Sequence, residues 1–260
     1  MFFWRPSESG ALGDRLARLV LEPALGLVKK ESSNHGLYLN LKKTKIMSNT
    51  ALEEFYLDGE SIEVVDNFNF LGSTIHKDGG LDLELRRRLS LGRAAMNKLT
   101  AVMKNHDVSL NTKVMLVNSL VFPVVLYGAE SWTLKLNDKR RINSFEIWCW
   151  RRVLRISWTQ KVTNEEVISR IAPNITLEAM VLKQKLTYFG HVMRNEFGIG
   201  RDIMLGRTEG SRRRGRQRTR WIQEVINSTG KKLAELKDLA KNRKVWKRVV
   251  HDVTRGRPRT

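Results

Sequence analysis

Carboxylates and histidines are the residues of this sequence that could carry out catalysis, and few of them lie close together along the chain. Asp78, Asp82 and Glu84 form one acidic group, at a turn and at the start of an expected helix. Acidic residues are ordinary in both places, because Asp favours turns and negative charge stabilises the first turn of a helix. No zinc-protease, Walker or nucleophile-elbow motif occurs, and no nucleophile is evident beside the remaining candidates, His76, His106 and His191. The sequence therefore predicts no catalytic residue and no metal site, and it argues against an independent hydrolase.

An arginine-rich tract at residues 211–221 is the strongest electrostatic signal, and its chemistry is phosphate binding. Gly215 interrupts a run of arginines: Arg212, Arg213, Arg214, Arg216, Arg218 and Arg220. Charges at this density cannot be buried without partners, so the tract either contacts phosphate or lies in water. The forked donors of arginine suit phosphate oxygens. Nucleic-acid contact is favoured, and a solvated linker and a nuclear-import signal are the alternatives.

Positive charge is concentrated in the C-terminal part of the chain. Residues 1–150 carry 20 Lys and Arg against 17 Asp and Glu, a net charge of +3. Residues 151–260 carry 27 against 10, a net charge of +17 out of a total of +20. A field of this size attracts polyanions, so the composition predicts a nucleic-acid or anionic-membrane partner.

The single cysteine and the lack of a long apolar run indicate in which cellular compartment the protein is found. Cys149 is the only cysteine, which excludes an internal disulfide, and no Cys/His cluster has the spacing of a zinc site. No apolar run approaches the roughly 20 residues of a membrane span. The first residues also lack the pattern of a secretion signal. Of the two partners that the charge allows, we therefore expect nucleic acid and no membrane, in an intracellular protein with no disulfide partner.

The elements that must position these groups change character at residue 80. Two strand-like runs flank the turn Asp58-Gly59, and residues 68–75 alternate in the same way, which predicts a small antiparallel sheet. Afterwards apolar residues recur near every 3.6 positions, which predicts helices over about 81–103, 109–126 and 138–156. The second helix should carry Leu110, Val114, Val117 and Leu120 toward the apolar run at 122–128 and bend or end at Pro123. The third should place Trp148 in the core, although the tryptophans Trp148, Trp150 and Trp158 could instead stack on bases.

Later helices and boundaries follow from capping residues and glycines. Ser109, Thr163 and Thr176 are good N-cap residues, the last opening a helix that should run to about Arg194. The fold class predicted is mainly α with a small antiparallel β element. Six segments are expected: a weakly structured N-terminus (1–26), β-hairpins (27–80), a helical bundle (81–160), a helical extension (161–197), a Gly/Arg-rich basic linker (198–220) and two short C-terminal helices (221–260).

Several stretches, in this order, resemble the reverse transcriptase of non-LTR (LINE) retrotransposons of the RTE or BovB-like group. The likeness covers about nine-tenths of the chain, from Val28 onward, and residues 1–26 do not share it. The matching text is Gly36–Met47, Phe70–Ser73, Phe122–Trp132, Trp148–Arg152, Tyr188–His191 and Arg213–Arg218. The resemblance implies that residues 36–76 are the last palm segments with their hairpins, that residues 81–160 are the helical thumb, and that a basic helical C-terminal region follows.

The same resemblance implies roles for individual residues. Lys43 falls where the family places a lysine against the phosphates of the incoming nucleotide, a solvated basic turn being the alternative. Phe70, Leu71 and Gly72 match the hairpin that grips the 3′ end of the primer. The cluster Arg86-Arg87-Arg88 lies on a helix that in the family approaches the template and primer. The implied partners are an RNA template and a DNA primer or target DNA, and the implied location is the nucleus.

The catalytic motif of the family is missing from this sequence. The family uses Ala-Asp-Asp and a further upstream aspartate to hold Mg²⁺, and no Asp-Asp pair occurs anywhere in the chain. We therefore expect a fragment of an RNA-directed DNA polymerase that keeps parts which hold nucleic acid but is inactive alone and takes no cofactor by itself. The alternatives are a non-catalytic DNA- or RNA-binding protein derived from a retroelement, and a translated relic without function.

Overall fold

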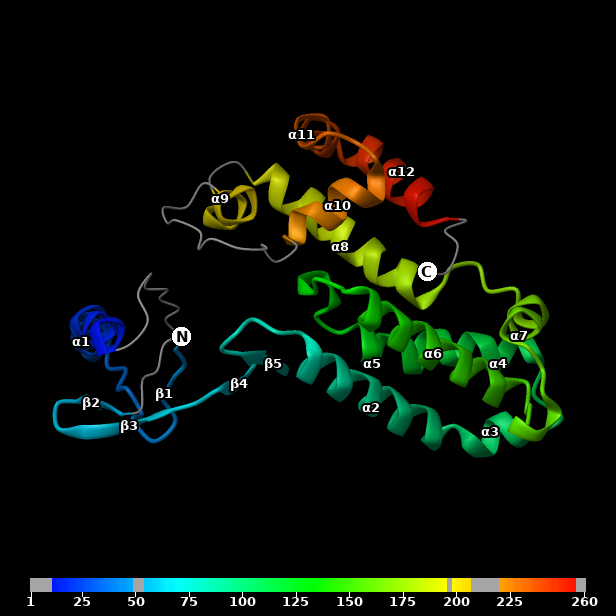
Figure 1. Cartoon of the computed structure of the whole chain (residues 1–260), viewed down its shortest axis with the longest axis horizontal. Coiled ribbons are helices and arrows are strands. Elements are labelled where there is room, and N and C mark those ends of the chain that lie inside the picture. Colours follow the sequence, from blue (N-terminus) through cyan, green and yellow to red (C-terminus); the bar gives the residue numbers. More distant parts are fainter. Residues whose placement is uncertain (1–10, 49–53, 196–197, 207–219, 256–260) are drawn as a thin grey trace. The chain divides into compact units, whose positions relative to one another are not determined.

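The computed structural model describes residues 11–48, 54–195, 198–206 and 220–255. The described chain is mostly helical with a small, largely antiparallel strand element (Figure 1), so the predicted fold class is confirmed. It divides into two compact units, the first ending at Glu84 and the second beginning at Leu85. Each unit has its own apolar core.

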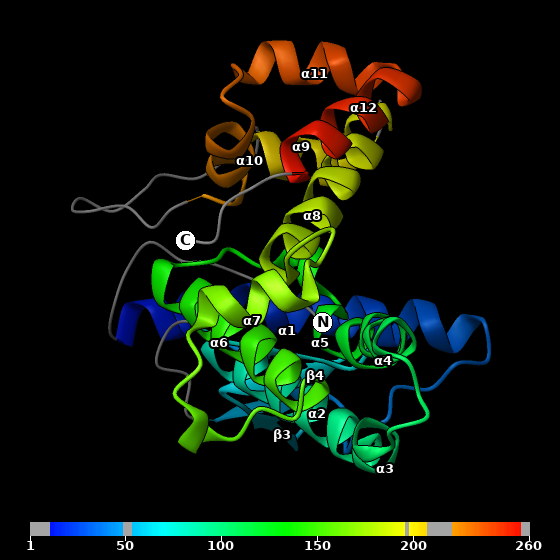
Figure 2. The same cartoon turned by 90° about the vertical axis from the view of Figure 1, so that its right-hand side faces the viewer.

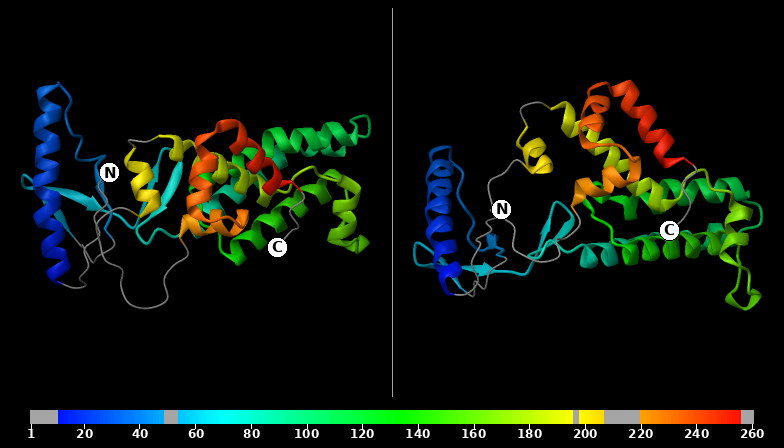
Figure 3. Two further views of the ribbon diagram at one scale, coloured as in Figure 1. Left: turned by 90° about the horizontal axis from the view of Figure 1, so that it is seen from above. Right: turned by 45° about the horizontal axis from the view of Figure 1, so that its top comes forward.

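The first unit packs one helix against three short strands. Helix α1 (Ala11–Asn34) lies beside β1 (Lys45–Ile46), β2 (Phe55–Leu57) and β3 (Glu60–Val64), as Figure 3 shows. The buried core residues of this cluster are Leu21, Leu25, Ile46, Phe55, Leu57 and Ile62. For residues 1–26 we expect irregular structure with a short helix, and the helix found is longer, beginning at Ala11 and continuing to Asn34. Leu21 and Leu25 lie one turn apart and are both buried, which stabilises a helix that Pro23 disfavours locally.

Two hairpins follow the sequence signals. β2 and β3 pair antiparallel across Asp58 and Gly59, whose φ angles of 51° and 80° fit the two-residue turn that matches strand twist. β4 (Asn67–Phe70) and β5 (Ser73–His76) pair in the same way. The predicted strands pair antiparallel as expected, but they form two sheets instead of one, and β1 pairs parallel to β3 on its other edge. With both edges of β3 occupied, β4 and β5 form a separate two-stranded sheet.

The first helices of the second unit surround a dense core. They are α2 (Asp82–Lys98), α3 (Thr100–Lys104), α4 (Leu110–Leu116), the π segment η1 (Val117–Val121), α5 (Phe122–Leu126), the 3-10 turn η2 (Ala129–Ser131) and α6 (Leu136–Val153). Figure 1 shows α2 running beside α5 and α6. A Cβ atom on Gly92 of α2 would come within 2.4 Å of Val125 and 2.8 Å of Phe145, so only glycine allows this approach.

Several details of these helices differ from the prediction. The helix expected over 81–103 is interrupted between α2 and α3. Of the residues expected on the apolar face, Val117 is buried, whereas Leu110, in the first turn of α4, and Leu120 are exposed. Leu120 lies in the π segment, which shifts the helical phase so that Val121 and Phe122 face the core. Ser109 caps α4 as predicted, accepting a hydrogen bond from the Thr112 N–H at 3.2 Å.

The remaining helices form the C-terminal part of the second unit. After the turn η3 (Trp158–Gln160) come α7 (Asn164–Ile171), α8 (Leu177–Arg194), α9 (Ile199–Leu205), α10 (Trp221–Thr229), α11 (Leu233–Lys241) and α12 (Arg243–Thr254). Thr163 and Thr176 cap α7 and α8 as predicted. Part of the expected linker, residues 199–205, is helical, and three C-terminal helices replace the two predicted, because Asn242 caps a separate α12.

Helix α8 is the platform on which the last helices pack. Figure 2 shows α10, α11 and α12 gathered at one end of it. The Trp246 ring of α12 lies 5.3 Å from the Phe189 ring, and its Nε1–H donates to the Leu186 carbonyl at 2.8 Å. Gly190 makes room for the indole, since a Cβ there would lie 2.2 Å from the Trp246 Nε1. At the other end of α8, the buried Glu146 of α6 accepts a hydrogen bond from the Leu177 N–H at 3.1 Å.

Candidate nucleic-acid interface

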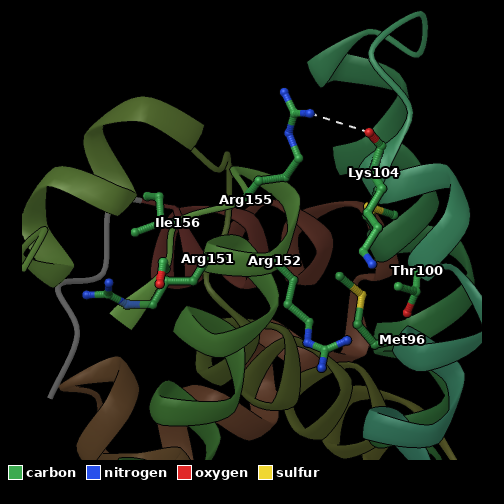
Figure 4. Close-up of a pocket in the computed structure, with 9 residues that line it drawn as sticks. Met96, Thr100, Lys104, Arg151, Arg152, Arg155 and Ile156 are labelled. Carbon is green, nitrogen blue, oxygen red and sulfur yellow. Dashed lines mark hydrogen bonds between the residues drawn. The ribbon is translucent and has the colours of Figure 1, made fainter. Parts of the chain in front are cut away.

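The C-terminal end of α6 and the helix α3 form a groove of about 480 Å³. Its apolar part is lined by Met96, Met103 and Ile156. Its cationic lining residues are Lys104, Arg151, Arg152 and Arg155, with Thr100 and Ser157 completing the wall. Figure 4 shows Arg152 pointing toward Met96, while Arg151 points the opposite way. We call this the α3–α6 groove.

Three arginines of this groove are held in place by carbonyl, amide and imidazole groups. Arg151 donates from Nη2 to the Val162 carbonyl at 2.6 Å, and Arg152 donates from Nη1 to the Asn97 Oδ1 at 2.9 Å. Arg155 lies 2.6 Å from the His106 Nε2, and its hydrogen bond to the Lys104 carbonyl is drawn in Figure 4. Among the described residues, no carboxylate forms an ion pair with these three guanidinium groups. Their positions are therefore fixed while their charge stays uncompensated, which suits an anionic ligand.

Trp148 also positions one of these arginines. Its ring stacks on Phe145 with centroids 5.7 Å apart, and the Arg152 guanidinium lies 4.6 Å from its centroid. A cation over an indole face is attracted by the ring quadrupole. Trp148 is only half-buried, and the fully buried tryptophan of α6 is Trp150, so the prediction of Trp148 as the core residue is wrong. The Trp150 indole donates a hydrogen bond to the buried Glu146 at 3.1 Å, so a polar partner accompanies this ring into the core.

A second groove, of about 450 Å³, lies where α2 meets the start of α6. Its lining residues are Arg86, Leu89, Arg93, Asn137, Arg140, Arg141 and Ser144. We call it the α2–α6 groove. Arg93 links the two grooves, because its guanidinium lies 6.0 Å from the Trp148 ring that also holds Arg152. Neither groove is lined by a carboxylate from the described residues.

The predicted cluster Arg86-Arg87-Arg88 is split by the helix. Arg86 is exposed and lines the α2–α6 groove, and Arg87 is half-buried. Arg88 is only 6% exposed, and its guanidinium lies 4.4 Å from the Tyr127 ring. Arg88 is thus packed inside the unit, unlike Arg86, and its contact with nucleic acid stays a prediction.

The other predicted residues belong to other parts of the chain. Lys43 lies in an exposed turn of the first unit, with its N–H on the Asn40 Oδ1 at 3.1 Å. Phe70, Leu71 and Gly72 form the tip of the β4–β5 hairpin, where Leu71 is 76% exposed and has a φ angle of 46°. Arg220 is exposed at the start of α10. Five of the predicted arginines lie outside the described residues: Arg212, Arg213, Arg214, Arg216 and Arg218.

A protein known from another organism is similar to this chain. The chain is 28% identical over 247 residues to a transposon-derived protein of Caenorhabditis elegans, and the alignment covers 86% of each chain. This chain resembles a transposon-derived protein. The likeness supports a transposable-element origin and extends across both units. No family model and no solved structure matches the chain.

The described acidic residues do not fit the magnesium ions of a transposon polymerase. No group of three or more His, Cys, Asp or Glu side chains in the described part of the chain is placed to hold a metal. Glu84 is buried, and its Oε2 accepts the Thr74 N–H at 2.9 Å. Asp78 lies in the turn after β5, where its Oδ2 is 3.4 Å from the His76 Nδ1. These carboxylates stabilise the junction of the hairpin and α2.

The only cysteine of the sequence has a thiol that is shielded from solvent. Cys149 is buried on α6, and burial, with a smaller contribution from Glu146, raises the pKa of its thiol far above the usual range. The thiol is therefore protonated and unreactive in the folded chain.

Among the described helices, none combines the length and the apolar character that crossing a membrane requires.

Most of the groove residues were not identified as a site from sequence. Arg93, Lys104, Arg140, Arg152 and Arg155 are separated along the chain and form no tract. Arg151, Arg152 and Arg155 do repeat at three- and four-residue spacing, which places them near one another on a helix. That spacing predicts a cationic face on the helix. It does not predict the groove, because the apolar floor that Met96 and Met103 contribute comes from another part of the chain.

Proposed function

We propose that the chain derives from the reverse transcriptase of a non-LTR retrotransposon of the RTE or BovB-like group, and that it binds nucleic acid without extending it. The order of the matching sequence stretches and the transposon-derived relative support the origin. The observation that carries binding is the α3–α6 groove, in which carbonyl, amide and imidazole groups position three guanidinium groups, and the cationic α2–α6 groove adds to it. An RNA template and a DNA primer or target DNA are the proposed partners, met in the nucleus.

The proposal of inactivity rests on charge. Nucleotidyl transfer needs carboxylates that hold divalent cations against the attacking and leaving oxygens. The sequence has no Asp-Asp pair, and its described carboxylates form no metal group. The purified chain should therefore leave a primer–template unextended when supplied with nucleotides and Mg²⁺. Primer extension above that of a no-protein control, resistant to further purification of the chain, would refute inactivity.

The binding proposal is tested by removing groove charges. A variant with three exposed groove cations replaced carries R93Q, K104Q and R152Q. A matched control removes the same charge from cations that already pair with a carboxylate three or four residues away: R170Q, K231Q and K241Q. Every phosphate that the protein no longer neutralises on duplex DNA lowers the slope of log affinity against log salt by about 0.9. We expect the groove variant to lower the slope by about 2.7 and the control by less than about 1.

The same measurement separates a groove effect from a folding effect. Circular dichroism and thermal unfolding should be similar for both variants, because the replaced side chains are at least partly exposed. Equal slopes for the groove variant, the control and the wild type would place the nucleic-acid contact outside the grooves. Absence of any salt-dependent binding by the wild type would refute the binding function itself.

A further inference from the structure

The solvent face of α12 has a row of cations that the sequence alone does not mark as a site. Lys244, Lys247 and Arg248 are exposed, and His251 continues the row one turn later. Residues three, four and seven positions apart lie on the same side of an α-helix. We call Lys244, Lys247 and Arg248 the α12 stripe. It is the basic half of a strongly amphipathic helix.

The opposite face of α12 is occupied inside the protein. Trp246 and Val250 are buried in the core that α8, α10, α11 and α12 share. Trp246 contacts Phe189 and donates its hydrogen bond to α8. An amphipathic helix that binds a membrane surface inserts its apolar face into the lipid. That face is not accessible here, so the stripe does not fit a lipid surface.

The charges of the stripe are open to solvent. The described residues supply no ion pair for Lys244, Lys247 or Arg248, whereas the only acidic residue of α12, Asp252, lies 3.2 Å from His251. By contrast, Lys231 and Lys241 of the neighbouring segment are paired with Glu235 and Asp238. Apart from the His251 imidazole, which lies beside Asp252, the exposed face of α12 presents no aromatic side chain on which a base could stack. Its chemistry is therefore attraction of phosphate alone.

We propose that the α12 stripe is a second nucleic-acid contact, which binds the phosphate backbone of a duplex and does not read its bases. A surface that acts by charge alone favours the ligand of highest linear charge density, and duplex DNA has one charge per roughly 1.7 Å of its axis. Backbone contacts position a protein without selecting a sequence. The inference does not require the retroelement origin, and it adds a site separate from the grooves.

The test compares three variants of the full chain on one duplex of about 20 base pairs and on a single strand of the same length. The stripe variant carries K244Q, K247Q and R248Q. The groove variant and the paired-cation control are those defined above. We expect the stripe variant to lower the duplex salt slope by about 2.7, as each phosphate left without its cation removes about 0.9, and to lower the single-strand slope by less. Two duplexes of unrelated sequence should show the same decrease.

Each outcome decides between the two sites. A stripe variant with the slope of the control overturns this inference, while a flattened slope in the groove variant would leave the proposed function standing. A flattened slope in the stripe variant alone would support the stripe and refute the grooves. Weaker binding of the stripe variant to vesicles of phosphatidylserine, with unchanged duplex binding, would replace nucleic acid by lipid and overturn the inference. A decrease that depends on duplex sequence would contradict backbone recognition.

Discussion

Helices α6 and α12 bury one apolar face and expose arginines or lysines on the other, but they hold these cations differently. At the end of α6, Arg151, Arg152 and Arg155 are tied to carbonyl, amide and imidazole groups and border a groove with an apolar floor. On α12, Lys244, Lys247 and Arg248 extend from an open helix face. The first arrangement fixes geometry as well as charge, so it can select the shape of a ligand. The second supplies charge alone.

The largest expected effect concerns the platform of α12. Lys185 of α8 is 1% exposed at its side chain and pairs with Glu224 of α10, while its Nζ lies 5.1 Å from the Trp221 ring. Lys185→Met leaves the Glu224 carboxylate without its partner, and breaking a buried pair in this way costs about 3–5 kcal/mol of unfolding free energy. Denaturant titration measures the loss. The double change of Lys185→Met with Glu224→Leu should recover most of it, and a double variant as unstable as the single one would contradict this role of the pair.

The same pair makes a pH prediction. Burial lowers the pKa of Lys185, with Glu224 partly opposing the shift. The unfolded chain then binds this proton at a pH where the folded chain has released it, so stability rises with pH in the interval from the lowered pKa up to the ordinary lysine value of 10.5. Unfolding titrations across that interval should show a rise for the wild type and a smaller one for the double variant.

Two close-approach glycines allow the helices to be perturbed one at a time. Gly92→Ala places a Cβ against Phe145 of α6, and Gly190→Ala places one against Trp246 of α12. Overpacking of this kind costs about 1–3 kcal/mol, of which the better helix propensity of alanine returns less than about 1 kcal/mol. Hydrogen exchange should increase on α2 and α6 in the first variant and on α12 in the second. Gly200→Ala, at an open position, is the control with little change.

The difference between α6 and α12 would be refuted if either glycine variant increased hydrogen exchange equally on both helices. Such a result would mean that the second unit opens as one cooperative body, and the groove and the stripe could not then be altered separately.

The smallest expected effect tests whether the groove arginines are held in position. Trp148→Ala removes the ring under Arg152 and should weaken single-strand binding by about 0.5–1 kcal/mol, the range of an exposed cation–π contact. In a background of Arg152→Gln the same change should have almost no effect, because the ring would have no guanidinium to hold. Fluorescence anisotropy titrations of the four proteins complete the cycle. Equal losses in both backgrounds would show that Trp148 stacks on a base instead.

Local signals in the sequence predicted much of this fold. Ser109, Thr163 and Thr176 marked helix starts because a hydroxyl that caps a backbone N–H acts within three residues. Asp58 and Gly59 indicated a hairpin because a two-residue turn also depends only on neighbouring residues. The parallel pairing of β1 with β3 was missed because it joins residues 18 positions apart in register, Lys45 to Glu63, with no local signature.

The candidate site was harder to predict because its parts meet only through packing. Arg88 looks like a surface cation until Tyr127, far along the chain, packs against it. Trp148 and Trp150 are two residues apart on one helix, and their burial depends on the buried Glu146 that accepts the indole hydrogen bond. The predicted tract at 212–218 lies outside the described residues, so its role stays a prediction.

The π segment Val117–Val121 gives this transposon-related chain a place where its length can vary. A π turn accommodates one residue more than the α turn it replaces. Deleting one of its exposed residues, Asn118 or Ser119, should close the segment into regular helix and leave Phe122 and Val125 seated in the core. A deletion inside α4 would instead rotate everything beyond it by about 100°. A single-residue deletion at this segment should therefore leave the fold intact.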